Sequence, residues 1–214
     1  MLTIVNSSQS HTCIKINNII GTIGSMSYGI AKSVELVAVK VIWDDGSAWT
    51  TDVIEGLEWI LMDHEARSSA TGRMPKSVVN MSLAGPYHQG YEEVINALLD
   101  AGIIIVSAAG NYDNDACNYM PAMVSRVIAV AALDIYDVTA SFTNYGYCVD
   151  ISAPGVDIKS TSLNDSTAVL SGTSMSCPHG VGVVARYQSS LDYAPTPEQV
   201  SGTNSHCLKS VNLP

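Results

Sequence analysis

The sequence predicts a single α/β domain built around a parallel β-sheet. Apolar runs of strand length alternate along the chain with amphipathic, helix-length segments, and no long polar linker separates them. The 214 residues are 47% hydrophobic and only 14% charged, which is enough apolar surface for a large core. In open parallel sheets, ligands bind beyond the carboxyl ends of the strands, so functional residues are expected there.

The first clear strand is expected at residues 34–43 (VELVAVKVIW). This nearly continuous apolar run, rich in β-branched residues, is typical of a buried parallel strand. Residues 51–66 follow as an amphipathic helix, whose apolar residues recur at helical spacing at Val53, Ile54, Leu57, Ile60 and Leu61. His64 on this helix is interpreted as a solvent-exposed surface residue.

The same pattern continues to the C-terminal third of the chain. A helix is predicted at residues 91–99 and is expected to stop at Gly102. Further strands are predicted at 77–82, 103–108, 127–133 and 167–170. The first three of these and the strand at 34–43 are expected to run parallel in one central sheet.

Charge and composition exclude several classes of function. A formal net charge of −10 and a pI near 4.7 argue against binding to nucleic-acid backbones or to anionic membranes. No apolar run reaches transmembrane length, and the N-terminal residues lack the pattern of a signal peptide. The chain is expected to be a monomer. The odd set of cysteines has no C-x-x-C pair, which gives no sign of a zinc site; one or two disulfides are expected, with their pairing open, among Cys13, Cys117, Cys148, Cys177 and Cys207.

The most informative stretch is residues 170–185, LSGTSMSCPHGVGVVA. The strand ends at Leu170, and a helix is expected to begin near Thr173 with Pro178 in its first turn. A serine at a helix N-terminus lies beside unpaired N–H groups and a favourable dipole, which suits a nucleophile whose reaction develops an oxyanion. Ser174 is therefore the candidate nucleophile. The alternative is a plain Ser/Thr cap on a packed helix.

Residues 172–179, GTSMSCPH, closely resemble the nucleophile motif G-T-S-M-[AS]-x-P-H of the subtilisin-like serine proteases, or subtilases. The resemblance implies a three-layer α/β fold with a parallel sheet and peptide-bond hydrolysis with Ser174 as nucleophile. His179 is then a structural residue. It lies five residues beyond Ser174, on another face of the helix, and is not expected to be the base. The small residues after His179 also resemble the family, with departures at Gly180, Val181 and Arg186.

A second motif supports the same resemblance. Residues 106–111, VSAAGN, are similar to the subtilase segment A-A-G-N, whose asparagine side chain donates to the oxyanion. The resemblance implies that Asn111 and the backbone N–H of Ser174 bind the same carbonyl oxygen. The alternative for Asn111 is an ordinary turn residue after glycine.

The segment after the strand at 77–82 resembles the S-L-G-G substrate-binding segment of the family. Small residues there would let an extended peptide pair with the backbone. Ala84 replaces a family glycine, and the alternative is a plain strand-to-loop turn. The predicted walls of the primary specificity pocket are small and uncharged, which suits apolar or aromatic substrate side chains. The residues of this predicted substrate site are Ser82, Leu83, Ala84, Gly85, Ala108, Ala109 and Gly110.

Three further stretches resemble the proteinase K-like branch of the subtilases: 118–122, 141–150 and 153–155. In that register Asp150 falls on a carboxylate that binds calcium in relatives, together with backbone carbonyls near Ser125 and Val127. A structural calcium ion is therefore expected. The alternative is a capping or ion-paired aspartate.

The catalytic base and its orienting acid are not found by motif. The family order is Asp, His, Ser, and no D-[TS]-G turn after an apolar strand is recognised before residue 44. Counting back from Gly21, the position of the catalytic histidine holds Lys15, and that of the motif's second histidine holds Asn18. A displaced copy of the motif would make His11 a weak candidate. The expected organisation is an atypical segment at 1–20, a peptidase domain at 21–200, incomplete at its N-terminus, and a divergent tail at 201–214.

The sequence thus suggests a serine endopeptidase of polypeptides, secreted by family resemblance although no signal peptide is present. The alternative is an inactive subtilase remnant, favoured by the missing motifs, and poor or absent peptide hydrolysis is expected for this chain. A different α/β hydrolase is disfavoured, because residues 172–176 lack the final glycine of G-x-S-x-G.

Overall fold

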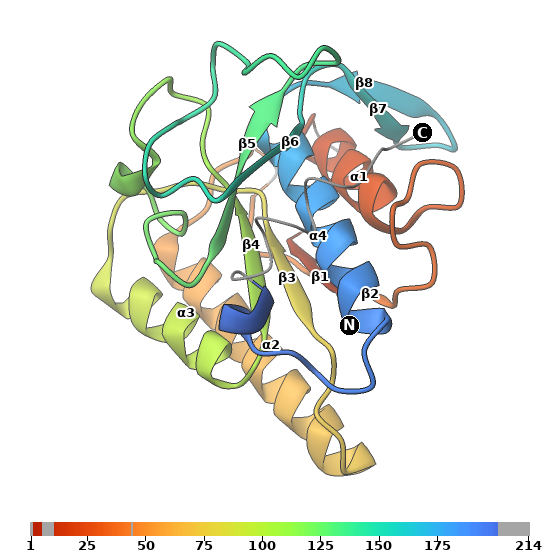
Figure 1. The fold of residues 1–214 in the computed structure, drawn as a ribbon, viewed down its shortest axis with the longest axis vertical. Helices are drawn as coiled ribbons and strands as arrows, with labels where there is room; N and C mark the ends of the chain where they lie inside the picture. The colour runs from red at the N-terminus through yellow and green to blue at the C-terminus, as the bar shows by residue number, and fades with distance from the viewer. Residues whose placement is uncertain (1, 6–10, 44, 201–214) are drawn as a thin grey trace.

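The computed structural model describes residues 2–5, 11–43 and 45–200 (Figure 1). The strands are β1 (Leu2–Val5), β2 (Leu36–Val39), β3 (Val78–Met81), β4 (Ile104–Ala108), β5 (Ile128–Leu133), β6 (Ile151–Pro154), β7 (Ile158–Thr161) and β8 (Thr167–Leu170). The helices are α1 (His11–Gly24), α2 (Thr50–Thr71), α3 (Gln89–Asp100), the short 3-10 helix Ala116–Asn118 and α4 (Thr173–Ser189).

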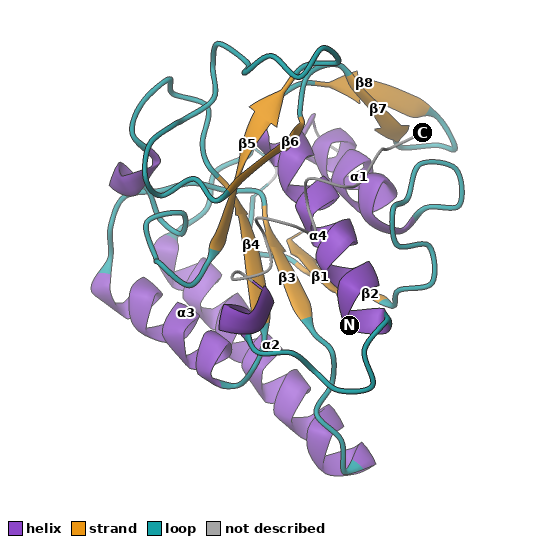
Figure 2. Ribbon diagram, in the orientation of Figure 1, coloured by secondary structure: helices purple, strands orange, loops and turns teal. Residues whose placement is uncertain are grey.

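The central sheet has six strands in the order β2-β1-β3-β4-β5-β6, and every neighbouring pair is parallel. The parallel arrangement predicted for the four main strands is therefore confirmed. Helices cover both faces, with α2 and α3 on one side and α1 and α4 on the other (Figures 1 and 2). This is the three-layer α/β fold that the sequence predicts.

Alternating side chains of each buried strand build the two separate cores. In β4, Ile104 and Val106 pack with α1 and α4, whereas Ile105 packs with α2 and α3. Val78 and Val79 of β3 divide between the two sides in the same way. Because both faces of these strands are buried, their sequences read as continuous apolar runs.

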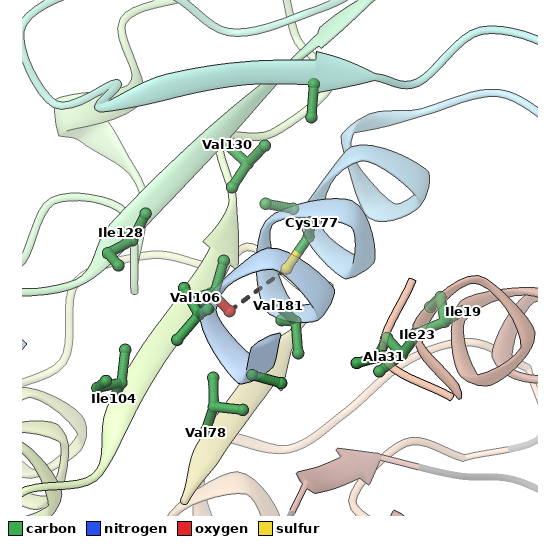
Figure 3. Packing of buried hydrophobic residues seen from close by; sticks show 14 of the residues in the cluster. Ile19, Ile23, Ala31, Val78, Ile104, Val106, Ile128, Val130, Cys177 and Val181 are labelled. Atoms are coloured by element: carbon green, nitrogen blue, oxygen red, sulfur yellow. Dashed lines mark hydrogen bonds between the residues drawn. The ribbon is translucent and has the colours of Figure 1, made fainter. Parts of the chain in front are cut away.

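Helix α4 crosses beneath the middle of the sheet and contacts β3, β4, β5 and β6 (Figure 3). Small residues on α4 permit this close packing, as the sequence suggests. A Cβ added at Gly182 would lie 2.7 Å from Cβ of Ile30, and one at Gly180 would lie 3.1 Å from Val130 Cγ2. The buried Cys177 also faces the sheet, where its thiol donates to the Val106 carbonyl at 3.3 Å.

Strands β7 and β8 form an antiparallel hairpin outside the main sheet. The hairpin packs against α1, and the fully buried Asn18 joins the two elements. Its Nδ2 donates to the carbonyls of Ile158, at 3.3 Å, and Ala168, at 3.0 Å.

None of the described helices combines the length and the apolar character needed to cross a bilayer.

The strand at the start of the sheet differs from its prediction. Only residues 36–39 of the predicted 34–43 form β2, and this strand lies at the sheet edge with alternate residues exposed, not buried. The apolar run therefore reflects a strand covered on one side only. The neighbouring strand β1 is absent from the prediction because its apolar run is only four residues long, although the turn residues Asn6-Ser7-Ser8 follow it in the sequence.

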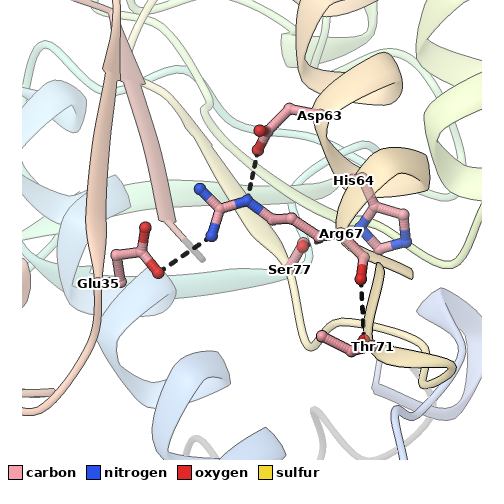
Figure 4. A network of polar contacts seen from close by, with 6 residues as sticks. All are labelled: Glu35, Asp63, His64, Arg67, Thr71 and Ser77. Carbon is pink, nitrogen blue, oxygen red and sulfur yellow. Dashed lines mark hydrogen bonds and ion pairs between the residues drawn. The ribbon is translucent and has the colours of Figure 1, made fainter. Parts of the chain in front are cut away.

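His64 is buried, so its interpretation as a surface residue is wrong. It is 1% exposed; Nδ1 lies 2.8 Å from Ser77 Oγ, and Nε2 lies 3.2 Å from Met74 Sδ (Figure 4). Helix α2 runs to Thr71, and the chain then turns back to cover this side chain. Burial lowers the pKa of His64. Arg67, one turn further along α2, instead pairs at the surface with carboxylates at 2.7 and 3.1 Å, those of Asp63 and Glu35 (Figure 4).

Candidate active site

Ser174 is the second residue of α4 and is 4% exposed. Gly172 precedes the helix at φ 148°, a conformation that favours glycine, and turns the chain from the β7–β8 hairpin into α4. The Ser174 hydroxyl donates to the Ser82 carbonyl at a long distance of 3.4 Å. The N–H of Ser174 is one of the first-turn donors that precede the regular helical ladder, whereas that of Met175 donates to the Gly172 carbonyl at 2.9 Å. The candidate nucleophile is thus held loosely beside backbone donors.

Asn111 lies directly beside this helix start. It follows β4, and its Oδ1 accepts from both the N–H of Thr173, at 2.8 Å, and the Thr173 hydroxyl, at 2.9 Å. These two bonds fix the orientation of the amide and leave Nδ2 as its outward donor. The structure therefore places Asn111 and Ser174 at the same edge of the sheet, as predicted. The oxyanion role of Asn111 stays a prediction.

Pro178 lies within α4 and not in its first turn, so its predicted place is wrong. Proline has no N–H, so the carbonyl four residues earlier, that of Ser174, loses its helical donor. The Ser82 hydroxyl takes the missing place and donates to that carbonyl at 3.0 Å. Asn80 Nδ2 in turn donates to the Ser82 hydroxyl at 3.0 Å. Sequence reasoning missed this link between the nucleophile helix and the end of β3.

The predicted substrate segment, residues 82–85, leaves β3 partly exposed, whereas Ala108, Ala109 and Gly110 are buried at the end of β4. The backbone of Gly85 is already paired with Met120, through N–H···O bonds of 3.0 and 2.8 Å. Gly85 therefore cannot offer those same groups to a peptide, although the space around its Cα is open. The substrate-binding roles of these residues stay predictions.

A disulfide between Cys117 and Cys148 answers the pairing that the sequence left open. It joins the loop after Asn111 to the segment between β5 and β6, with a Cα–Cα distance of 5.2 Å. Cys177 is a free, buried cysteine, and burial raises the pKa of its thiol to about 12. It is therefore expected to be chemically inert. The side chains of Cys13 and Cys207 lie outside the described residues.

Asp150, the predicted calcium ligand, binds the neighbouring strand. Its Oδ2 accepts from the N–H of Ala129 at 2.8 Å, and desolvation raises the pKa of its carboxyl. Within residues 2–5, 11–43 and 45–200, no cluster of three or more His, Cys, Asp or Glu side chains could hold a metal ion. One carboxylate would supply few of the oxygens that calcium takes, so backbone carbonyls would have to supply the rest. The calcium site stays a prediction.

The side of the site that should hold the base departs from the family. Lys15 lies on α1 in a partly buried position, and burial lowers the pKa of its ammonium group. The lowered pKa moves the Lys15 side chain toward its neutral amine form, a shift that the sequence alone does not indicate. His11 begins α1, but its side chain lies outside the described residues.

The histidines whose side chains are described do not bond to Ser174. His64 contacts Ser77, and the His88 ring accepts from the Tyr91 N–H at 3.4 Å. The half-buried His179 places Nδ1 2.8 Å from the Met175 carbonyl, which agrees with a structural residue.

Strand β1 supplies the kind of strand that precedes the catalytic acid in the family motif. A parallel strand does precede residue 44, between β2 and β3 in the sheet, which the sequence had not indicated. The residues after it read Asn6-Ser7-Ser8, however, and not D-[TS]-G. Asn6 carries a neutral amide, so this sequence does not supply the carboxylate of the family motif.

Comparisons with known proteins agree with this architecture. The sequence profile of the Subtilase family matches residues 3–210. A subtilisin-like serine protease of Rhodotorula mucilaginosa is 46% identical over 171 residues, covering 79% of this chain and 50% of that protein. One from Penicillium citrinum is 43% identical over 176 residues, covering 79% of this chain and 38% of that protein. The chain thus spans half or less of the length of these relatives.

A solved structure extends the likeness to three dimensions. The crystal structure of a cold-adapted subtilisin-like serine proteinase superimposes with a TM-score of 0.82 at 35% sequence identity. The match covers 96% of this chain and 73% of that one. With the motif around Ser174, the three-layer sheet and the profile match over most of its length, this chain belongs to the subtilase family of serine proteases.

Proposed function

We propose that this chain acts as a serine endopeptidase on extended polypeptides, with Ser174 as nucleophile. The observation that carries the proposal is the pair of hydrogen bonds from Thr173 to Asn111 Oδ1, at 2.8 and 2.9 Å. They hold the Asn111 Nδ2 donor beside the start of α4, where the Ser174 N–H is the second donor. Two fixed donors next to a hydroxyl are the arrangement that acyl transfer needs.

The chemistry follows from this arrangement. The Ser174 Oγ attacks the peptide carbonyl carbon while a base takes its proton, and the carbonyl oxygen becomes an oxyanion bound by Asn111 Nδ2 and the Ser174 N–H. Collapse of the tetrahedral intermediate breaks the C–N bond while the protonated base returns its proton to the leaving nitrogen, which departs as the free amine. Water then hydrolyses the acyl-enzyme and regenerates Ser174. Two residues of α1 are the base candidates to test: Lys15, at the family's position for the base, where burial lowers the pKa of the ammonium group, and His11, from the displaced copy of the motif.

Substrate class and compartment belong to the same proposal. Small, uncharged residues around 82–85 and 108–110 suit a substrate with an apolar or aromatic side chain before the cleaved bond. The Cys117–Cys148 disulfide supports secretion, because such bonds persist in oxidising compartments. The proposal also includes a calcium ion bound at Asp150 and a monomeric protein.

A second candidate is an inactive subtilase fold that only binds peptides. It is favoured by the Ser174 hydroxyl, whose hydrogen-bond partner among the described residues is the Ser82 carbonyl and not a base. An unassisted serine hydroxyl is a weak nucleophile near neutral pH. In that case the predicted substrate segment at 82–85 would retain peptide affinity without turnover.

The deciding experiment compares hydrolysis of a chromogenic peptide by the parent chain, Ser174→Ala and Ser176→Ala. Ser176 is a matched control, because it is buried two residues along the same helix and its Oγ has no hydrogen-bond partner among the residues that the structure describes. The proposal expects turnover that Ser174→Ala abolishes and Ser176→Ala retains. Equal, near-background rates in all three, with peptide binding intact, would establish the inactive alternative.

A further inference from the structure

Asn144 is a fully buried side chain that lies against the loop carrying Asn111. It belongs to the connection between β5 and β6 and is 0% exposed. Its Nδ2 donates to the Ala109 carbonyl at 2.9 Å. Its backbone N–H donates to the Gly110 carbonyl, also at 2.9 Å. Asn144 therefore binds both residues that precede Asn111.

The same side chain also binds the residues that follow Asn111. Its Oδ1 accepts from the N–H of Tyr112 at 2.9 Å and from the N–H of Asn114 at 3.3 Å. One buried amide thus holds the backbone on both sides of Asn111. A buried amide satisfied on both its donor and acceptor atoms fixes local conformation strongly, because losing any partner leaves a desolvated polar group.

Two features show that this contact is rigid. Gly110 has φ 108°, and a Cβ there would clash with Asn144 Nδ2, so the close approach requires glycine. The neighbouring Thr143 ties Asn144 to the sheet: its hydroxyl accepts from the Ala132 N–H of β5 at 3.0 Å and donates to the Asn144 carbonyl at 3.3 Å. Asn144 is therefore attached to the core of the domain and does not lie on an exposed surface loop.

Other connections between these two segments act further along the chain. The N–H of Asp113 donates to the Phe142 carbonyl at 3.0 Å, and that of Ala116 donates to the Tyr145 carbonyl at 2.8 Å. The Cys117–Cys148 disulfide lies beyond both. Close to Asn111 itself, Thr173 binds the side-chain amide, and Asn144 binds the backbone before and after it.

We propose that Asn144 is a positioning residue of the oxyanion site. It keeps the peptide units around Asn111 in the one arrangement in which Thr173 can orient the amide, and so keeps Nδ2 aimed at the developing oxyanion. This inference rests on the proposed function for its catalytic consequence and on the hydrogen bonds alone for its structural part. Oxyanion stabilisation depends on donors that are already in place, and a shift of about 1 Å can cost about 10²-fold in rate.

The test compares Asn144→Ser with the matched control Asn114→Ser. Asn114 is on the same loop, but its side chain is exposed and, within the described part of the chain, bonds to Tyr119 and Asp115. The first readout is ¹⁵N relaxation of the Asn111 side-chain amide, assigned by its loss in Asn111→Ala. Asn144→Ser is expected to halve the heteronuclear NOE of this group or shift its signals, whereas Asn114→Ser leaves them as in the parent.

The second readout is a double-mutant cycle in kcat on an activated peptide ester. Asn144→Ser is expected to lower kcat about tenfold with KM changed less than about twofold, and to have no further effect once Asn111 is alanine. An unchanged Asn111 signal in folded Asn144→Ser, or additive losses in the cycle, would overturn the proposal. If Asn144→Ser does not fold, Asn144→Asp replaces only the donor to Ala109 and takes the same two measurements. Should Ser174→Ala hydrolyse as fast as the parent, the proposed function fails while the NMR readout still decides the role of Asn144.

Discussion

The two sides of the candidate active site are built very differently. On one side, Ser174 and Asn111 lie at the ends of α4 and β4 and are joined by Thr173. On the other side, where the family places its base and acid, α1 carries Lys15 and the sequence after β1 reads Asn-Ser-Ser. The backbone framework is present on both sides, but the family's side chains are present on only one.

This difference shows that a fold can retain its active-site scaffold when some of its chemistry changes. The parallel sheet, α4 and the loop after β4 are fixed by core packing that does not involve a base. The proposed oxyanion donors, the Asn111 amide and the Ser174 N–H, lie at the ends of elements that this packing holds in place. The base and acid need particular titratable groups, which packing alone does not require.

The largest effect is expected from restoring the family's base. Lys15→His should raise Ser174-dependent hydrolysis by about 10²-fold, because an imidazole is largely neutral near pH 7, whereas a lysine becomes so only if its pKa falls by several units, and general bases contribute about 10²–10⁴-fold. Initial rates on a chromogenic peptide give the measurement, with Lys15→Gln as control. Equal rates in the two variants would mean that position 15 does not serve the base role.

Removal of the oxyanion amide should weaken the intact side. Asn111→Ala is expected to lower kcat about 10²–10³-fold with little change in KM, the size of effect known for the oxyanion asparagine of subtilisin itself. Steady-state kinetics beside Asn118→Ala provide the check, since Asn118 is an exposed asparagine nearby. A matching loss in both variants would point to general damage of the loop and not to a lost donor.

Stability should depend strongly on the disulfide that braces the intact side. Replacing Cys117 and Cys148, which are 31 residues apart, by serine should lower the free energy of unfolding by about 3–4 kcal/mol. Urea unfolding with and without a reducing agent measures this. The reducing agent should destabilise the parent and leave the double variant unaffected; a parent insensitive to reduction would contradict the expectation.

The smallest effect is a dependence of stability on pH from His64. Burial lowers the folded-state pKa of His64 below its ordinary value of 6.5, so below that pH the unfolded chain binds a proton that the folded chain does not. The free energy of unfolding should therefore fall as pH drops through about 6.5, by at most about 1.4 kcal/mol per pH unit for this group. His179 is shifted in the same direction. Urea titrations between about pH 5 and 7.5 give the free energy of unfolding at each pH, and this energy should change less steeply with pH in His64→Gln than in the parent. An unchanged pH dependence would exclude His64 as its source.

The intact side was predicted well because its signals are local. The buried strands give continuous apolar runs, and the residues from 106 to 111 and from 172 to 179 carry short motifs whose strand-end position follows from the parallel sheet. Asn144 was missed as a contributor because its role depends on contacts across more than 30 residues. No sequence period reveals such a contact.

The remaining errors share one physical cause: each depends on which distant part of the chain lies beside the residue, or on the lack of one. His64 occupies an apparently polar position on α2 and is buried only because the chain turns back after Thr71. The run at 34–43 looks like a core strand, yet β2 has no neighbour on its outer side in the described sheet. Pro178 was placed at a helix start, whereas its missing N–H is compensated by Ser82 from β3.

The two edges of the described sheet have a consequence for behaviour at high concentration. Each edge strand, β2 and β6, is only four residues long; Glu35 and Lys40 flank the first, and Pro154 ends the second. Short strands, adjacent charges and a residue without an N–H all weaken pairing with a strand from another molecule. The sheet therefore offers little template for edge-to-edge aggregation, even though its central strands are almost entirely apolar.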